Sequence, residues 1–122
     1  MFSQYRDENK LEQEVSFIGG STQYISFEIL DRNDSPIDLT GAEIRWALSY
    51  IGQNANPILI KDNKSRGGIT TTQKGVFTVE LTPNDTKMLG SNKYEQEPTI
   101  IQANGKVLKP AYGILNIKKG AM

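Results

Sequence analysis

The chain has 122 residues, carries 14 Lys plus Arg against 14 Asp plus Glu, and contains neither Cys nor His. A chain of this length typically forms one domain. The missing Cys excludes disulfides, thiol nucleophiles and thiolate metal sites, and the missing His removes the commonest general acid–base group and metal ligand. The zero net charge argues against a general nucleic-acid coat. We therefore expect a protein that is not an enzyme, holds no cofactor and binds no nucleic acid.

Targeting and membrane segments are not visible in the sequence. No stretch approaches the ~20 consecutive apolar residues that span a bilayer. The first ten residues, Met1 to Lys10, lack the apolar core of a signal peptide. We expect no membrane partner and synthesis in a cytoplasm, and the missing cysteines agree with a reducing compartment.

Period-2 alternation predicts two strands in the first half of the chain. The first strand covers residues 23–30 and ends at the turn-forming run Asp31–Pro36. The second strand covers residues 43–50 and has Trp46 near its middle, so we expect Trp46 at the centre of the core. The predicted inward side chains of the two strands are Ile25, Phe27, Ile29, Ile44, Trp46, Leu48 and Tyr50.

The middle of the chain predicts a short apolar strand at residues 57–60 and then a hairpin. Residues 69–72 are β-branched throughout, Gln73-Lys74-Gly75 has the composition of a tight turn, and residues 76–81 return as the second strand. We expect one buried core made of Ile25, Phe27, Ile29, Ile44, Trp46, Leu48, Phe77, Val79 and Leu81.

Residues 82–90 have the order of a short helix. Thr82 can act as a cap, Pro83 stands in the first turn, Lys87 comes late and Gly90 ends the run. We expect one short helical turn near residues 83–89 that crosses from one sheet to the other.

The last third predicts a second hairpin. Its strands cover residues 94–102 and 107–117, and Asn104-Gly105 is a strong signal for the turn between them. Pro98 and Pro110 lie inside these strands. Because proline cannot donate a hydrogen bond to a ladder, we expect both strands to be sheet edges or to be bulged at these points.

Short strands with turns about every ten residues and almost no helix favour an all-β fold. We predict an antiparallel Ig-like β-sandwich of seven to eight strands. A small closed barrel is the alternative, because alternation does not reveal strand order. Only the first residues lack strand character, so we expect an N-terminal arm at residues 1–13 and a single β-sandwich domain over residues 14–122.

Three features were considered as chemical sites. The string Asp31–Asp38 clusters oxygens of the kind that calcium uses, but it lacks the Gly and the Glu of an EF-hand loop, and we predict an Asx-type turn instead. Glu95 and Glu97 share a strand face at roughly 7 Å, a separation compatible with glycosidase chemistry. No oxyanion stabiliser or sugar platform accompanies them. The strings Gly19–Thr22 and Arg66–Gly68 lack the features of phosphate loops and are predicted to be turns. We therefore assign no catalytic, cofactor-binding or metal residue.

The two ends of the chain carry opposite charge. Residues 1–14 hold four acids and two bases, a balance of −2, and residues 105–122 hold four lysines and no acid, a balance of +4. The functional interpretation is self-association or partner docking through the N-terminal arm and the C-terminal hairpin. The alternative is that both termini are simply solvated.

The sequence resembles a small β-sandwich family of tailed-phage and prophage structural proteins, best known from the N-terminal domains of phage baseplate upper proteins. The resemblance covers about residues 19–118, and the segments that carry it are Gly20-Ser21-Thr22, Pro36–Leu48, Gly68–Thr71, Gly75–Thr82, Asp85–Gly90 and Tyr112–Ile117. The usual tight Gly-x-Tyr after the helical turn is here spread over Gly90–Tyr94, and no second domain follows, so we expect a free-standing relative.

The resemblance implies a virion building block in a baseplate, tail or head–tail connector. Such a protein is made in the bacterial host cytoplasm, is carried in the virion and has other virion proteins as partners. A homo-oligomer is one of the arrangements that would suit this role, because weak interfaces gain strength by repetition in a ring.

The alternative function is a carbohydrate-binding or adhesin-like sandwich. Such a module needs exposed aromatic side chains in a row as a sugar platform. The candidates are Tyr5, Tyr24, Tyr50, Tyr94 and Tyr112. Tyr50 and Tyr94 are predicted to face inward, so we expect no small-molecule ligand.

Overall fold

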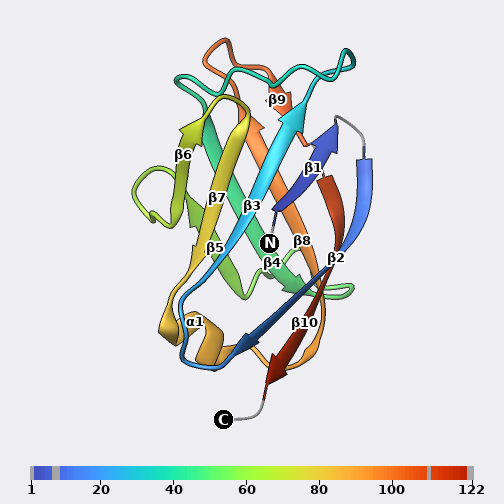
Figure 1. The fold of residues 1–122 in the computed structure, drawn as a ribbon, viewed down its shortest axis with the longest axis vertical. Coiled ribbons are helices and arrows are strands. Elements are labelled where there is room, and N and C mark those ends of the chain that lie inside the picture. Colours follow the sequence, from blue (N-terminus) through green and yellow to red (C-terminus); the bar gives the residue numbers. More distant parts are fainter. Residues whose placement is uncertain (1, 7–8, 110, 121–122) are drawn as a thin grey trace.

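The computed structural model describes residues 2–6, 9–109 and 111–120, which form two packed β-sheets and one short helix (Figure 1). Sheet A has the order β1 (Phe2–Arg6), β3 (Gln23–Leu30), β7 (Val76–Leu81), β6 (Ile69–Gln73). Sheet B has the order β2 (Asn9–Ile18), β10 (Ala111–Gly120), β8 (Asn92–Ile101), β4 (Glu43–Tyr50), β5 (Leu59–Asp62), with β9 (Val107–Leu108) also paired to β8. The predicted all-β sandwich is confirmed, and two separate sheets exclude the closed barrel.

The core lies between the two sheets and matches the predicted one. All nine predicted side chains are completely buried. The rings of Phe27 and Phe77, from neighbouring strands of sheet A, stack with their centroids 4.8 Å apart. On sheet B, the Trp46 indole Nε1–H donates to Gln96 Oε1 at 3.0 Å, which satisfies the polar atom of the largest buried side chain.

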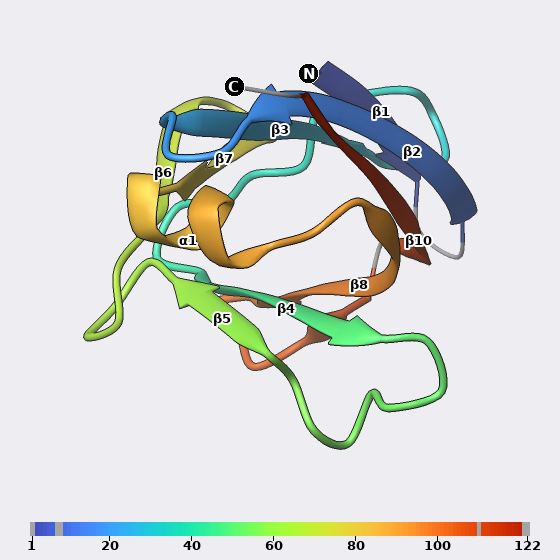
Figure 2. The same cartoon turned by 90° about the horizontal axis from the view of Figure 1, so that it is seen from below.

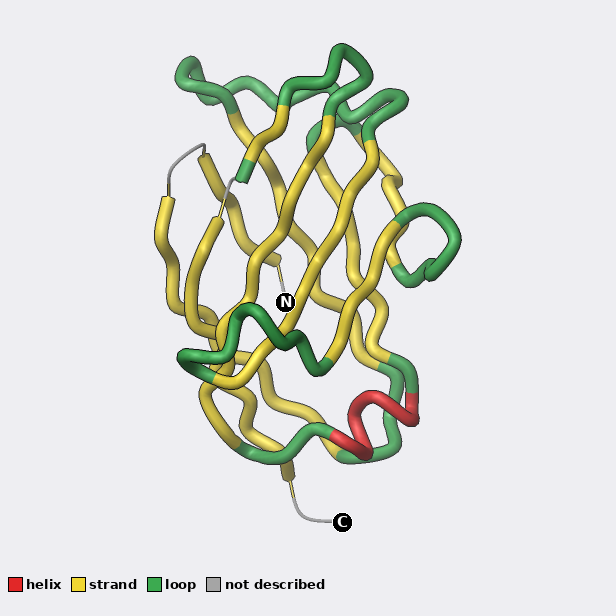
Figure 3. The backbone as a smooth tube through the Cα atoms, turned by 180° about the vertical axis from the view of Figure 1, so that it is seen from behind, coloured by secondary structure: helices red, strands yellow, loops and turns green. Residues whose placement is uncertain are grey.

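The predicted helical turn is helix α1 (Pro83–Met88), which leads from β7 of sheet A to β8 of sheet B and closes one end of the sandwich (Figures 2 and 3). A capping box starts it: the Asp85 N–H donates to Thr82 Oγ1 at 3.2 Å, and the Thr82 N–H donates to Asp85 Oδ2 at 2.8 Å. Asp85 Oδ2 also accepts from Lys61 Nζ at 2.6 Å. The helix is therefore tied to β5 as well as to its own first turn.

The N-terminal residues differ from the prediction. In place of an arm at residues 1–13, the chain forms β1 and the first half of β2, so the predicted lack of strand character is wrong. Both strands pair in parallel, β1 with β3 and β2 with the C-terminal β10. The sandwich is thus not purely antiparallel and has more strands than the seven or eight predicted. The Ig-like arrangement stays a prediction.

Pro98 is not on an edge strand. It lies in β8, which has β4 on one side and β10 and β9 on the other. Residues 92–96 of β8 pair with β10, and residues 100–101 pair with β9. Pro98 stands between these two ladders, where none of the described residues is paired to it on that side, and this gap accommodates the missing N–H. Pro110 lies outside the described residues.

Candidate interaction surfaces

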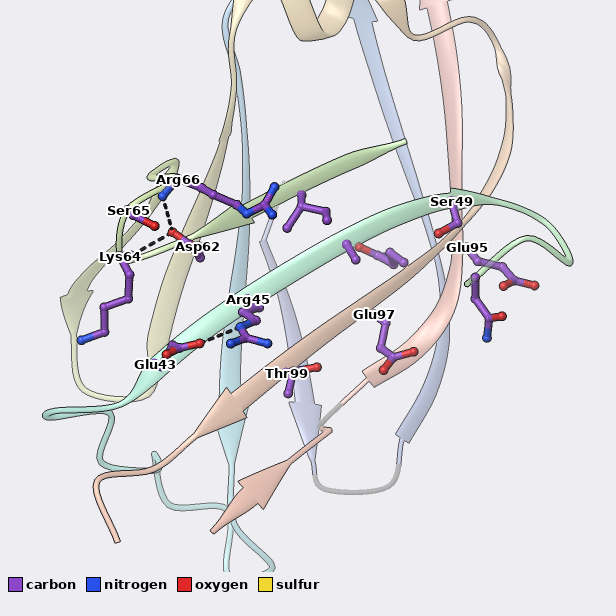
Figure 4. Close-up of a pocket in the computed structure, with 14 residues that line it drawn as sticks. Glu43, Arg45, Ser49, Asp62, Lys64, Ser65, Arg66, Glu95, Glu97 and Thr99 are labelled. Carbon is purple, nitrogen blue, oxygen red and sulfur yellow. Dashed lines mark hydrogen bonds and ion pairs between the residues drawn. The ribbon is translucent and has the colours of Figure 1, made fainter. Parts of the chain in front are cut away.

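A groove of about 510 Å³ crosses the outer face of sheet B (Figure 4). Ala47 of β4 and Ile60 of β5 are paired neighbours within its lining. Charged side chains line much of the rest. The charged lining residues are Glu43, Arg45, Asp62, Lys64, Arg66, Glu95 and Glu97. With three bases and four acids, the groove selects neither a polyanion nor a polycation by net charge.

The basic side of the groove is built by a loop that wraps around Asp62. The Asp62 carboxylate is buried, and its Oδ1 accepts from the backbone N–H groups of Lys64 (2.9 Å), Arg66 (3.1 Å) and Gly67 (3.0 Å). Burial opposes ionisation of Asp62, but these hydrogen bonds outweigh it and hold its pKa below the ordinary value. The carboxylate therefore fixes the loop that presents Lys64 and Arg66.

The acidic side carries the predicted carboxylate pair. As predicted, Glu95 and Glu97 both point to the outer face of β8, where they line the groove (Figure 4). Glu95 Oε1 accepts from the Gly52 N–H at 3.1 Å, and Glu97 Oε1 is ion-paired with Lys109 Nζ at 2.5 Å. Glu43 of β4, another acid that lines the groove, is ion-paired with Arg45, whose Nε lies 2.6 Å from Glu43 Oε2. Each of these carboxylates has a structural partner, so the groove offers a mixed-charge contact surface.

The Asp31–Asp38 string forms the predicted Asx turn. Asp31 Oδ1 accepts from the N–H groups of Asn33 (2.8 Å) and Ser35 (3.0 Å), and Asp38 Oδ1 accepts from the Thr40 N–H at 3.0 Å. The side-chain oxygens thus serve the turn itself. Within the described ranges, no three acidic side chains come together in a way that could hold a metal ion.

Both glycine-containing strings are turns, as predicted. Gly20 has a φ of 86°, and its N–H donates to Thr86 Oγ1 at 3.1 Å, which attaches the β2–β3 turn to α1. Thr86 Oγ1 in turn donates to the Ser21 carbonyl at 2.6 Å. Gly67 and Gly68, with φ of 74° and 94°, end the loop around Asp62.

The three tyrosines whose side chains are described do not line up as a sugar platform. Tyr94 is buried, as predicted, but Tyr50 is 50% exposed, so the prediction that it faces inward is wrong. Tyr50 is the last residue of β4, and its ring leans on Tyr94 with centroids 5.7 Å apart. Tyr24 is also exposed, but it belongs to sheet A. Tyr5 and Tyr112 lie outside the residues whose side chains are described.

The oppositely charged ends of the chain contact each other within one molecule. Strand β2 lies beside β10 along its whole length. Glu14 Oε2 is ion-paired with Lys118 Nζ at 3.3 Å, and both side chains are more than half exposed. This contact is an intramolecular use of the charges that the sequence suggested for self-association, and that association stays a prediction.

One surface was missed by the sequence analysis: the end of the sandwich that α1 closes. Ile18, Tyr50 and Met88, which are the last residues of β2, β4 and α1, are about half exposed there, as is Ile51. Alternation is a poor guide at such positions because the opposite sheet no longer covers a side chain at the end of its strand. Within the described residues, no helix has the length and apolar character needed to cross a bilayer.

The chain is similar in structure to the N-terminal domain of phage TP901-1 ORF48. The TM-score is 0.58, the sequence identity is 10%, and the match covers 96% of this chain and 99% of that one. No protein-family model and no curated protein matches the chain. At this identity the likeness shows the fold, and it agrees with the β-sandwich expected from the resemblance to phage structural proteins.

Proposed function

We propose that this chain is a non-enzymatic structural domain of a phage or prophage particle, which acts by assembling with other virion proteins. The observation that carries the proposal is the near-complete overlap with a phage N-terminal domain, which leaves almost no part of the chain outside the shared fold. The resemblance of residues 19–118 to baseplate upper proteins points the same way and favours a place in the baseplate, the tail or the connector.

The chemistry of the surface supports a role in assembly. The acids of the outer groove have partners within the chain: the Gly52 N–H for Glu95, Arg45 for Glu43, Lys109 for Glu97, and the backbone of its own loop for Asp62. Ion pairs and hydrogen bonds of this kind stiffen a surface. A stiff surface loses little entropy when it docks, which favours repeated contacts between virion proteins.

Deletion of the gene from its prophage tests the proposal. We expect induced cells to release particles that are defective in tail or baseplate assembly and have lost infectivity, and we expect the intact gene supplied in trans to restore them. As a control for catalysis, Glu95→Gln removes one carboxylate of the pair, while its amide oxygen can still accept from the Gly52 N–H, so it should restore assembly as well as the unchanged gene does. Normal infectious particles from the deletion strain would contradict the proposal.

A further inference from the structure

Exposed apolar side chains gather at the end of the sandwich that α1 closes, here called the α1 end. Six large hydrophobic side chains of the described residues are about half exposed, and four of them stand at this end: Ile18, Tyr50, Ile51 and Met88. The segments that form it are residues 18–22, 50–58, 82–93 and 117–120 (Figure 2). A concentration of exposed apolar side chains at one place on a small domain is typical of a binding surface.

Hydrogen bonds hold these segments in one frame. The Gly20 N–H donates to Thr86 of the helix at 3.1 Å, and Lys119 Nζ donates to the Lys87 carbonyl at 3.0 Å. The 50–58 segment is attached by the Gly52 N–H, which donates to Glu95 Oε1 at 3.1 Å, and by the ring of Tyr50, which packs on Tyr94; the Tyr94 hydroxyl in turn donates to the Gly90 carbonyl at 2.9 Å. The apolar side chains at the α1 end are therefore presented by a preorganised scaffold.

The charge of the α1 end is positive. Its four segments contain four lysines, namely Lys87, Lys93, Lys118 and Lys119, and a single carboxylate, Asp85. Asp85 is ion-paired with Lys61 and Lys118 with Glu14, and the carboxylate of Glu95, just beyond the third segment, accepts from the Gly52 N–H, so lysines still outnumber carboxylates at this end. The described loops at the opposite end, residues 31–42, 73–75 and 102–106, contain three acids and three bases.

We propose that the α1 end is the surface through which the domain docks onto a different virion protein, and that this partner presents carboxylates around an apolar centre. The inference rests on the proposed function. An apolar centre with a rim of complementary charge is the usual anatomy of a specific protein interface. The lysines also argue against a second copy docked end to end through the same surface, because like charges would then face each other.

A matched pair of double variants tests the location. Lys87→Glu with Met88→Glu changes a lysine and an adjacent exposed apolar residue at the α1 end, and Lys106→Glu with Val107→Glu makes the same change at the opposite end, where Val107 is 54% exposed. Each gene is supplied in trans to the deletion strain, and mass spectrometry counts copies of the chain per purified particle. We expect incorporation to fall about tenfold or more for the first variant and to stay unchanged for the second.

Melting temperatures of both purified variants show whether each is folded, and incorporation is compared only between folded proteins. If the α1-end variant unfolds, Ile51→Glu, in the exposed loop after β4, replaces it. Equal incorporation of the α1-end variant and the unchanged chain, or equal losses in both variants, would overturn the proposed location while leaving the structural function intact. Absence of the unchanged chain from particles would overturn both. Binding of the unchanged chain to phosphatidylglycerol vesicles, lost in the α1-end variant, would assign the surface to a lipid partner and overturn a protein one.

Discussion

Asp85 connects the capping of α1 to an ion pair, and its removal has a predictable cost. Asp85 Oδ2 accepts from Lys61 Nζ at 2.6 Å, and the two side chains are only 14% and 12% exposed. An exposed ion pair contributes ~0–1 kcal/mol to the free energy of unfolding, whereas removing one partner of a fully buried pair lowers that free energy by ~3–5 kcal/mol. The Lys61–Asp85 pair is mostly but not completely buried, so the cost of breaking it lies between these two values. Asp85→Asn should therefore lower the free energy of unfolding by about 2 kcal/mol.

For a domain of this size that loss lowers the melting temperature by about 6–8 °C. Thermal and urea unfolding, followed by the fluorescence of the buried Trp46, measure it. Glu97→Gln is the matched control, because it makes the same carboxylate-to-amide change in the Lys109 pair, whose side chains are 59% and 31% exposed. The control should cost less than about 1 kcal/mol. A loss for Asp85→Asn no larger than that of the control would refute the reasoning.

Three further predictions concern the core, metal binding and pH. Trp46→Ala should cost ~3–5 kcal/mol in chemical unfolding, because it empties a completely buried site and removes the hydrogen bond from the indole N–H to Gln96 Oε1; a melting temperature within a degree or two of the unchanged chain would contradict this. Calcium should not raise the melting temperature, and a rise that Asp34→Ala abolishes would show a metal site in the Asp31–Asp38 loop. The pKa values of Asp62 and Asp85 lie below the ordinary 3.8, because hydrogen bonds to their charged forms outweigh burial, so their stabilisation is present above that pH and is lost as the pH falls through the lowered values. Acid titration of the unfolding free energy should show this loss, and Asp85→Asn should reduce it.

Alternation predicted the core well because it reports a local property. A strand with one buried face must alternate, so Phe27, Trp46 and Phe77 could be assigned inward without knowledge of strand order. The same rule failed for Tyr50. Its alternation continues that of Leu48, but β4 ends there, and the opposite sheet no longer covers the ring.

Pairing between distant parts of the chain could not be predicted in this way. Residues 2–6 and 9–13 acquire their strand structure from β3 and β10, and the second of these partners lies about a hundred residues away in sequence. The missing N–H of Pro98 predicts an edge strand or a bulge, but the gap between the β10 and β9 ladders provides another place for such a residue. The α1 end was missed for the same reason, because its side chains come from four separate segments.

Quantitative mass spectrometry of particles purified from an induced culture tests whether this chain is a structural component of a phage particle. We expect the chain to copurify with the tail proteins through a density gradient and a high-salt wash, at a fixed whole-number ratio to them. A chain found only in the soluble fraction, or present in particles at a ratio that varies from one preparation to another, would contradict it.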